Sequence, residues 1–170
     1  MDRTETPAAP PPARPQSRLS PILLWVLAAA VLFRVVTALV DRGAEEGPGL
    51  VRWQPRERAT ALAQKSGKPI LYEFSAAWCG PCKLLDRDWE DASVAARVND
   101  GFVPAHIIDR IREDGQNPED ITELQRRFEI SGFPALVAAS PDGKLLGKLE
   151  GYPGRQRLLQ FLENPQTSSE

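Results

Sequence analysis

The sequence has few of the residues that build metal centres or covalent scaffolds. Its 170 residues include two cysteines and one histidine. Two cysteines are too few for a disulfide scaffold. A zinc site needs about four ligands, and the chain offers only the cysteines and a distant His106. Haem attachment is excluded because Lys83, not histidine, follows the second cysteine. We therefore expect no metal or other cofactor, and we interpret His106 as an ordinary strand histidine.

The chain also lacks the charge pattern of a nucleic-acid-binding protein. Its formal net charge is −2, and no basic run is longer than Arg126-Arg127. No aromatic residues are interleaved with basic clusters, so we expect no nucleic-acid partner. The sequence contains no internal repeat. A composition of 42% hydrophobic and 26% charged residues fits one globular domain with appendages.

The N-terminal segment is unlike a globular domain. Residues 1–21 are rich in proline, alanine and arginine and form no apolar face, which predicts a disordered tail, with a proline-rich SH3-type ligand as the alternative. Residues 22–40, ILLWVLAAAVLFRVVTALV, are apolar except for Thr37 and Arg34, and approach the roughly 20 residues of a membrane-spanning helix. A central arginine costs about 2.5–3.5 kcal/mol, whereas the leucine, isoleucine, valine and phenylalanine residues contribute roughly −4 to −7 kcal/mol. The balance predicts a transmembrane anchor.

A cleaved signal peptide is the alternative to this anchor. Its apolar region would be Ile22–Phe33, but the preceding region is long and proline-rich, and no good cleavage site follows. For an uncleaved span, Arg14 and Arg18 precede the apolar run, while Asp41, Arg42, Glu45 and Glu46 follow it. The positive-inside rule then favours a cytoplasmic N-terminus and an exported C-terminal domain.

The rest of the chain has the pattern of an α/β domain. We expect a linker at residues 41–50, a domain at 51–165 and a disordered C-terminus at 166–170. Helices alternate with strands before a closing hairpin and a last helix, which predicts helices flanking a central mixed β-sheet. Ser93 and Asn117 are the expected caps of two of the helices. The expected elements are helices near 55–67, 79–90, 93–99, 118–128 and 152–164, and strands near 70–74, 102–109, 134–140 and 144–151.

Both cysteines lie in the stretch YEFSAAWCGPCK, residues 72–83. A structural cross-link between such close neighbours closes almost no loop and constrains the unfolded chain little. The pair is therefore expected to carry chemistry.

The segment WCGPCK, which follows an apolar strand and opens a helix, resembles the active site of the thioredoxin family. ISGFPALV resembles the family's cis-proline segment, which implies a cis bond before Pro134. DGKLLGKLEGY resembles its closing hairpin, with Gly151 after it. The resemblance covers about residues 52–164. The long first helix and the extra helix in DASVAARVNDGF look more like the C-terminal domain of the membrane thiol reductase DsbD than like free thioredoxin.

The resemblance implies a role for each residue of the dithiol site. Cys79, at a helix N-terminus that favours an anion, is the expected nucleophile, and Cys82 resolves the mixed disulfide. Glu73 stands where thioredoxins carry a buried aspartate and would shuttle a proton for Cys82. A solvated Glu73 is the alternative. Trp78 is expected at the docking surface, with core packing as the alternative.

The same resemblance places client contacts beside Cys79. Gly80 and Pro81 set the helix start, and a Gly-Pro pair is typical of reductants in this family. With Pro134 cis, the backbone of Phe133 would lie opposite Cys79 and pair with an extended client segment.

The predicted function is a membrane-anchored thiol–disulfide oxidoreductase that reduces disulfides in extracytoplasmic client proteins. It would sit in a bacterial inner membrane as a single-pass protein with its domain in the periplasm, or be exported after signal cleavage. Because that space is oxidising, a transmembrane thiol reductase would have to supply electrons. The alternatives are a disulfide oxidase or isomerase, and a non-catalytic assembly factor.

Overall fold

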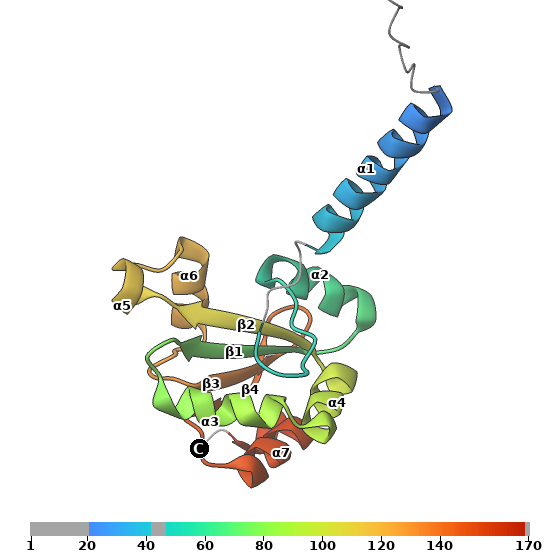
Figure 1. The fold of residues 1–170 in the computed structure, drawn as a ribbon. Coiled ribbons are helices and arrows are strands. Elements are labelled where there is room, and N and C mark those ends of the chain that lie inside the picture. Colours follow the sequence, from blue (N-terminus) through green and yellow to red (C-terminus); the bar gives the residue numbers. More distant parts are fainter. Residues whose placement is uncertain (1–20, 42–46, 169–170) are drawn as a thin grey trace, which may run out of the picture. The chain divides into compact units, whose positions relative to one another are not determined.

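The computed structural model describes residues 21–41 and 47–168. The chain divides into two compact units, residues 1–40 and residues 41–170. The second unit contains the expected α/β domain (Figure 1). Its helices are α2 (Arg56–Ser66), α3 (Gly80–Trp89), α4 (Ala92–Gly101), α5 (Ile111–Asp114), α6 (Glu119–Arg127), α7 (Arg155–Glu163) and the 3-10 helix η1 (Pro165–Ser168), and its strands are β1 (Ile70–Ala76), β2 (Val103–Asp109), β3 (Ala135–Ala139) and β4 (Leu145–Glu150).

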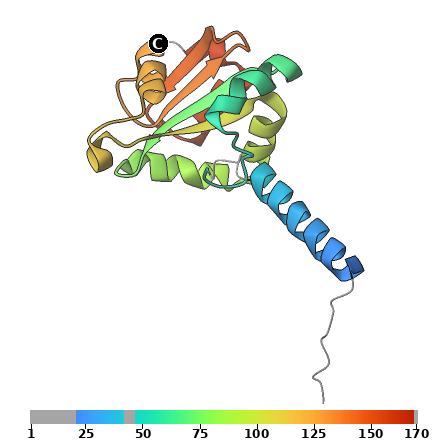
Figure 2. The same cartoon turned by 90° about the horizontal axis from the view of Figure 1, so that it is seen from above.

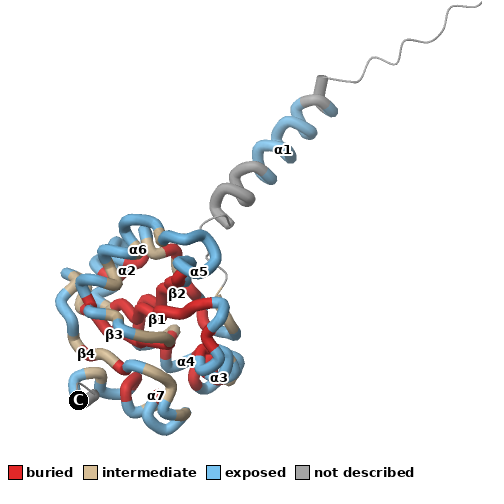
Figure 3. The backbone as a smooth tube through the Cα atoms, turned by 90° about the vertical axis from the view of Figure 1, so that its left-hand side faces the viewer, coloured by how far each residue is buried: buried red, intermediate tan, exposed pale blue. Residues whose placement is uncertain are grey.

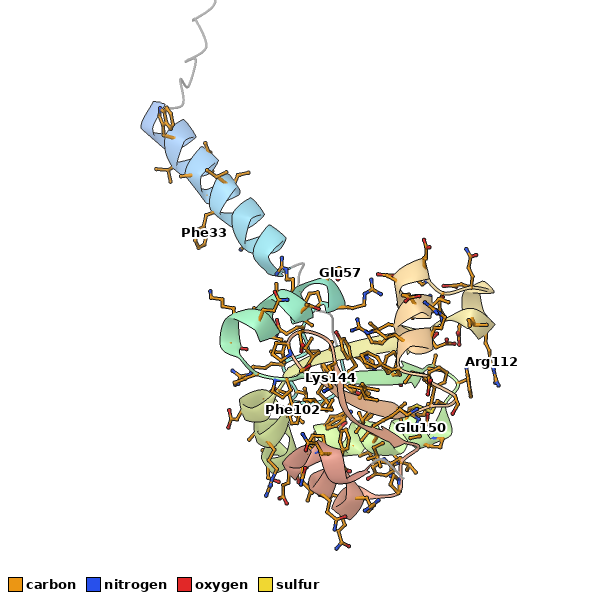
Figure 4. All side chains as sticks on the ribbon, turned by 180° about the vertical axis from the view of Figure 1, so that it is seen from behind. Phe33, Glu57, Phe102, Arg112, Lys144 and Glu150 are labelled. Carbon is orange, nitrogen blue, oxygen red and sulfur yellow. A yellow bond between two sulfur atoms is a disulfide. The ribbon has the colours of Figure 1, made fainter. Side chains whose placement is uncertain are left out.

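The first unit contains a single described helix, α1 (Pro21–Asp41). Its described apolar side chains are exposed, and Phe33 projects from the helix in Figure 4. Among the residues with described side chains, no helix is both long and apolar enough to cross a membrane. The anchor expected at 22–40 therefore stays a prediction. Residues 1–20 of the expected tail lie outside the described residues.

A mixed four-stranded sheet, in the order β2-β1-β3-β4, forms the centre of the described domain. β1 pairs in parallel with β2 and antiparallel with β3, and β3 pairs antiparallel with β4. Every residue of β1 is buried, as Figure 3 shows, because helices cover both faces of the strand. The mixed sheet is confirmed, and the elements of the domain follow the predicted order except for two additional short helices, α5 and η1.

The two faces of the sheet carry separate hydrophobic clusters. α2 and α6 cover one face and α3, α4 and α7 cover the other (Figures 1 and 2). Alternate residues of β1 point to opposite faces, so Tyr72 and Phe74 face α2 and α6, while Leu71 faces α3. The same alternation places Glu73 on the α3 face. The sheet thus carries an acidic group directly beneath the helix that holds both cysteines.

Two predicted helix caps are wrong. α4 begins after Asp91, whose Oδ1 accepts hydrogen bonds from the backbone N–H groups of Ser93 (2.9 Å) and Val94 (3.3 Å). A carboxylate two residues before Ser93 reaches these donors, so the hydroxyl is not needed as the cap. Asn117 does not cap α6 either. Its side chain binds backward, to the backbone N–H of Arg110 and to Asp109, and α6 begins after Pro118.

The domain extends beyond both ends of the expected globular region. On the N-terminal side, Leu50 N–H donates to the carbonyl of Trp89 (2.7 Å) and the Trp53 indole donates to the carbonyl of Pro48 (2.9 Å). Gly49 has a φ of +73°, and a Cβ there would lie 2.2 Å from the carbonyl carbon of Trp89. Residues 47–50 of the expected linker are therefore packed on the domain, while residues 42–46 lie outside the described residues.

On the C-terminal side, most of the segment expected to be disordered at 166–170 belongs to η1. η1 packs on β4 because Gly147 leaves room for it: a Cβ at that position would lie 1.9 Å from the carbonyl oxygen of Pro165. Residues 169–170 lie outside the described residues.

Candidate active site

Cys79 and Cys82 are joined by a disulfide at the start of α3. Cys79 is the N-cap residue, with Gly80 and Pro81 in the first turn. The backbone N–H of Cys82 donates to Sγ of Cys79 at 3.1 Å. This N–H is one of the donors that a helix leaves unpaired at its N-terminus, so the fold aims a partial positive charge at the Cys79 sulfur. Both cysteines are buried, which limits attack to a partner that docks closely.

Aromatic and apolar residues surround the disulfide. Trp78 is 43% exposed and meets Phe133 edge-to-face, with ring centroids 5.9 Å apart. Phe133 in turn packs against the cysteine pair and Ala76. The Phe133–Pro134 peptide bond is cis, so this prediction is confirmed. The carbonyl of Pro134 accepts a hydrogen bond from the N–H of Gly151 (2.8 Å), which ties the loop to the end of β4. These contacts place Trp78 and Phe133 beside the disulfide.

A groove of about 250 Å³ begins at Trp78 and Phe133. Its other walls come from α5 and from the loop before Phe133. Arg112 of α5 lies over the Trp78 ring, 3.5 Å from the ring centroid, and marks this end of the domain in Figure 4. Such a stacked guanidinium interacts with the ring by a cation–π contact. The contacts that the sequence predicts for Gly80, Pro81, Phe133 and Pro134 with a client stay predictions.

Glu73 is fully buried on the face of the sheet that α3 covers. Burial and, to a smaller extent, the negative charge of Asp86 together raise the pKa of its carboxyl to about 8. The nearby Trp89 indole N–H acts in the opposite direction and lowers this pKa. Among the described residues, both carboxylate oxygens and the Trp89 Nε1 have no hydrogen-bond partner. The expected buried acid is confirmed, and its carboxyl is half neutral near pH 8.

His106 is a residue of this region that the sequence did not identify. It lies beside Glu73 in the register of β1 and β2, and it lines a crevice of about 300 Å³ with Cys82 and Asp86. Burial lowers the pKa of its imidazole to about 4, so the ring is neutral at physiological pH. The residue was interpreted as an ordinary strand histidine, because only the strand register reveals its neighbour. The alternation of VPAHIID could have placed it on the face of α3.

No cluster of three or more His, Cys, Asp or Glu side chains suited to a metal ion occurs in the described part of the chain. The groups of this region are the two sulfurs, the buried carboxyl of Glu73, the neutral imidazole of His106, and Lys83 and Asp86 on the wall of the crevice. These groups suit thiol exchange and proton transfer.

A central mixed sheet, a disulfide at a helix N-terminus and a cis-proline loop beside it define a protein of the thioredoxin fold. Residues 56–166 match the family model for the thioredoxin-like domain. The chain therefore belongs to the thioredoxin-like domain family.

Individual relatives agree with this assignment. Thioredoxin Y2 of Arabidopsis thaliana chloroplasts is 30% identical over 103 residues, which cover 61% of this chain and 54% of that protein. The chain thus spans about half the length of that relative, and 18% of the Aspergillus niger protein disulfide-isomerase tigA.

Solved structures show the same fold. The oxidoreductase DsbH superposes with a TM-score of 0.58 at 18% identity, covering 75% of this chain and 97% of that chain. The oxidised C-terminal domain of DsbD from Neisseria meningitidis gives a TM-score of 0.52 at 20% identity, covering 64% and 90%. At these identities the likeness shows the fold alone.

Proposed function

We propose that this chain is a membrane-anchored thiol–disulfide oxidoreductase that reduces disulfides in client proteins outside the cytoplasm. The observation that carries the proposal is the backbone N–H of Cys82 directed at Sγ of Cys79. In the reduced protein the same donor and the helix dipole stabilise a thiolate on Cys79. A thiolate is the form of cysteine that attacks disulfides.

The reaction takes place in two exchange steps. The Cys79 thiolate attacks a client disulfide, a mixed disulfide forms, and one client sulfur leaves as a thiolate. Glu73 accepts the proton of Cys82, whose thiolate then attacks Sγ of Cys79 and releases the second client sulfur. The client disulfide gains two electrons and becomes two thiols, and the Cys79–Cys82 pair loses two electrons and becomes the disulfide seen in this structure.

Trp78, Phe133 and the groove that leads from them to α5 form the proposed client surface. Trp78 is exposed next to a buried Cys79, so a client chain that reaches the sulfur also contacts the indole. We expect Trp78→Ala to lower kcat/KM for a protein disulfide. The same variant should change the reaction with a small disulfide much less, because a small molecule does not fill the groove.

Reduction is favoured over oxidation by the Gly80-Pro81 pair between the cysteines, which is typical of reductants in this family. An oxidase or isomerase is the second candidate, because the relative tigA is named as a protein disulfide-isomerase. Equilibration with glutathione separates the two. A reductant would have a reduction potential similar to that of thioredoxin, about −270 mV. The reduction potential of an oxidase would approach about −120 mV.

The proposed anchor is α1. Its 21 residues span about 32 Å at 1.5 Å per residue, close to the thickness of the hydrocarbon core. The charges flanking residues 22–40 favour a single pass through a bacterial inner membrane with the domain in the periplasm. A soluble exported protein after signal cleavage is the alternative. A domain in an oxidising space needs electrons from across the membrane, for which a transmembrane thiol reductase is the proposed donor.

The test uses the pre-reduced full-length chain and a protein disulfide such as that of insulin. We expect stoichiometric reduction by the wild type, none by Cys79→Ser, and a trapped mixed disulfide on Cys79 in Cys82→Ser. Reduction by Cys79→Ser at the wild-type rate would contradict the assignment of the nucleophile. Full rescue of a deletion strain by a chain lacking both cysteines would instead support a non-catalytic assembly factor.

A further inference from the structure

Two polar side chains from neighbouring strands carry buried atoms that have no hydrogen-bond partner in the described part of the chain. Glu73 of β1 and His106 of β2 are paired in the parallel register, so both side chains face the same side of the sheet. Among the described residues, no donor meets the oxygens of Glu73 and no partner meets Nε2 of His106. Buried polar atoms are rarely left unpaired, and a catalytic role is one reason for an exception. The pair therefore calls for a functional explanation.

The crevice of about 300 Å³ brings His106 and the resolving cysteine to one space. Cys82, Lys83 and Asp86 of α3 line one side, and His106 lines the other. Trp53 packs on the imidazole, with ring centroids 5.5 Å apart, which fixes the position of the ring. A space of this size with polar groups on its walls admits water from the solvent.

We propose that His106 is a positioning residue of the resolving step, whose imidazole holds water in the crevice so that protons pass between Glu73, Cys82 and solvent. The inference rests on the proposed oxidoreductase function. It adds His106 as the residue that connects the buried carboxyl of Glu73 to solvent. Glu73 receives the proton of Cys82 when the Cys82 thiolate attacks Cys79. That proton must leave Glu73 before the next cycle, and among the described residues no hydrogen-bond partner of the Glu73 oxygens is there to receive it.

The charges around the pair determine how His106 acts. Asp86 of α3 carries the negative charge that acts on Glu73, and Lys83 and Glu90 act on Asp86 in opposite directions. Trp53 and Trp89 add no charge. The imidazole is neutral because burial lowers its pKa, so it acts through hydrogen bonds to water and not as a counter-charge. Removing it leaves the Glu73 carboxylate less solvated, which raises the pKa of Glu73 and shifts the resolving step to higher pH.

The test follows the reduced full-length chain as it reacts with glutathione disulfide between pH 5 and 10. Quenched samples give the rate at which the mixed disulfide of Cys79 and glutathione is resolved by Cys82. We expect His106→Leu to slow this step about tenfold at pH 7, which corresponds to a midpoint raised by about one pH unit. His106→Gln keeps a hydrogen-bonding group and should stay within about twofold of the wild type.

A double-mutant cycle separates positioning from a general structural effect. If His106 acts through Glu73, then His106→Leu causes no further slowing in a Glu73→Gln background. Equal slowing in both backgrounds, or an unchanged pH profile in His106→Leu, would overturn the proposal.

A second readout does not depend on turnover. Carbon-13 NMR of the Glu73 carboxyl should show its titration midpoint moving upward in His106→Leu and not in His106→Gln. An unmoved midpoint refutes the role of His106. A wild type that resolves glutathione but leaves protein disulfides intact refutes the proposed client reduction and leaves the role of His106 standing.

Discussion

Burial decides what the individual active-site residues can do. Cys79 and Cys82 are reached only by a partner that docks closely, and Glu73 holds its proton to about pH 8 because burial disfavours its charged form. An exposed glutamate would be ionised at neutral pH, and its pKa would be too far below that of a thiol for efficient proton exchange between the two. The chemistry of the site therefore depends on the burial of the Glu73 carboxyl. This burial is unfavourable when the carboxyl is ionised, and it should have a measurable effect on the free energy of unfolding.

We predict that Glu73→Gln stabilises the oxidised chain at alkaline pH. The carboxyl titrates near 4.5 when unfolded and near 8 when folded, so the folded state holds the extra proton between these values. Wild-type stability therefore falls as pH rises from about 4.5 to 8, by an amount on the order of several kcal/mol. Urea unfolding should show a much larger gap between variant and wild type at pH 9 than at pH 5. A gap that does not change with pH would contradict the buried acid.

The sequence could predict the residues of the dithiol site because they are local. WCGPCK, the cis bond before Pro134 and the buried position of Glu73 each follow from one contiguous segment and its resemblance to a family. His106 could not be found in this way, because its neighbour Glu73 is 33 positions away and meets it only through the register of β1 and β2. Helix caps failed for another reason: several side chains near each start could serve, and tertiary packing selected among them.

At the scale of elements, α5 is the clearest departure from the expected fold. No helix is expected between the strand near 102–109 and the helix near 118–128, yet α5 forms at Ile111–Asp114. A buried carboxylate organises it. Asp109, at the end of β2, accepts hydrogen bonds from the N–H of Ile111 (3.2 Å), from Asn117 (2.5 Å) and from Gln125 (2.9 Å). These bonds hold α5 where Arg112 covers Trp78.

We predict that Asp109→Ala destabilises the domain by about 2–3 kcal/mol, because it leaves several donors around a buried site without their acceptor. It should also loosen α5 and raise the fluorescence sensitivity of Trp78 to an added quencher. Asp114→Ala is the matched control, since it removes only the exposed ion pair with Arg110 and should change little. Equal unfolding midpoints for the two variants would refute the anchoring role of Asp109.

At the scale of the whole molecule, the chain joins an apolar helical segment to a domain that has its own core. Residues 41–170 form a compact unit with two hydrophobic clusters, one on each face of the sheet. The domain thus has the packing to hold its site without help from residues 1–40. The proposed role of α1 is to hold the domain at the membrane. The apolar content of α1 then determines how many charged residues the helix tolerates while it still inserts.

We predict that Leu27→Arg abolishes membrane insertion. With Arg34 alone, residues 22–40 favour insertion by roughly 0.5–4.5 kcal/mol, and a second central arginine costs about 2.5–3.5 kcal/mol more. Carbonate extraction of cells should leave the wild type in the membrane fraction and release the variant. Arg34→Leu is the control and should stay in the membrane. Release of all three chains would rule out an anchor, and retention of all three would show that residues 22–40 tolerate more charge than this account allows.

The thiolate on Cys79 is the claim on which the account depends, and its titration tests that claim most directly. In the reduced full-length chain with Cys82→Ala, Cys79 is the single thiol, and the rate of its alkylation by iodoacetamide can be followed from pH 4 to 10. We predict a midpoint between about 3.5 and 7.5, because the start of α3 stabilises the anion. A midpoint at about 8.5 or above, as for a free cysteine, would contradict the account.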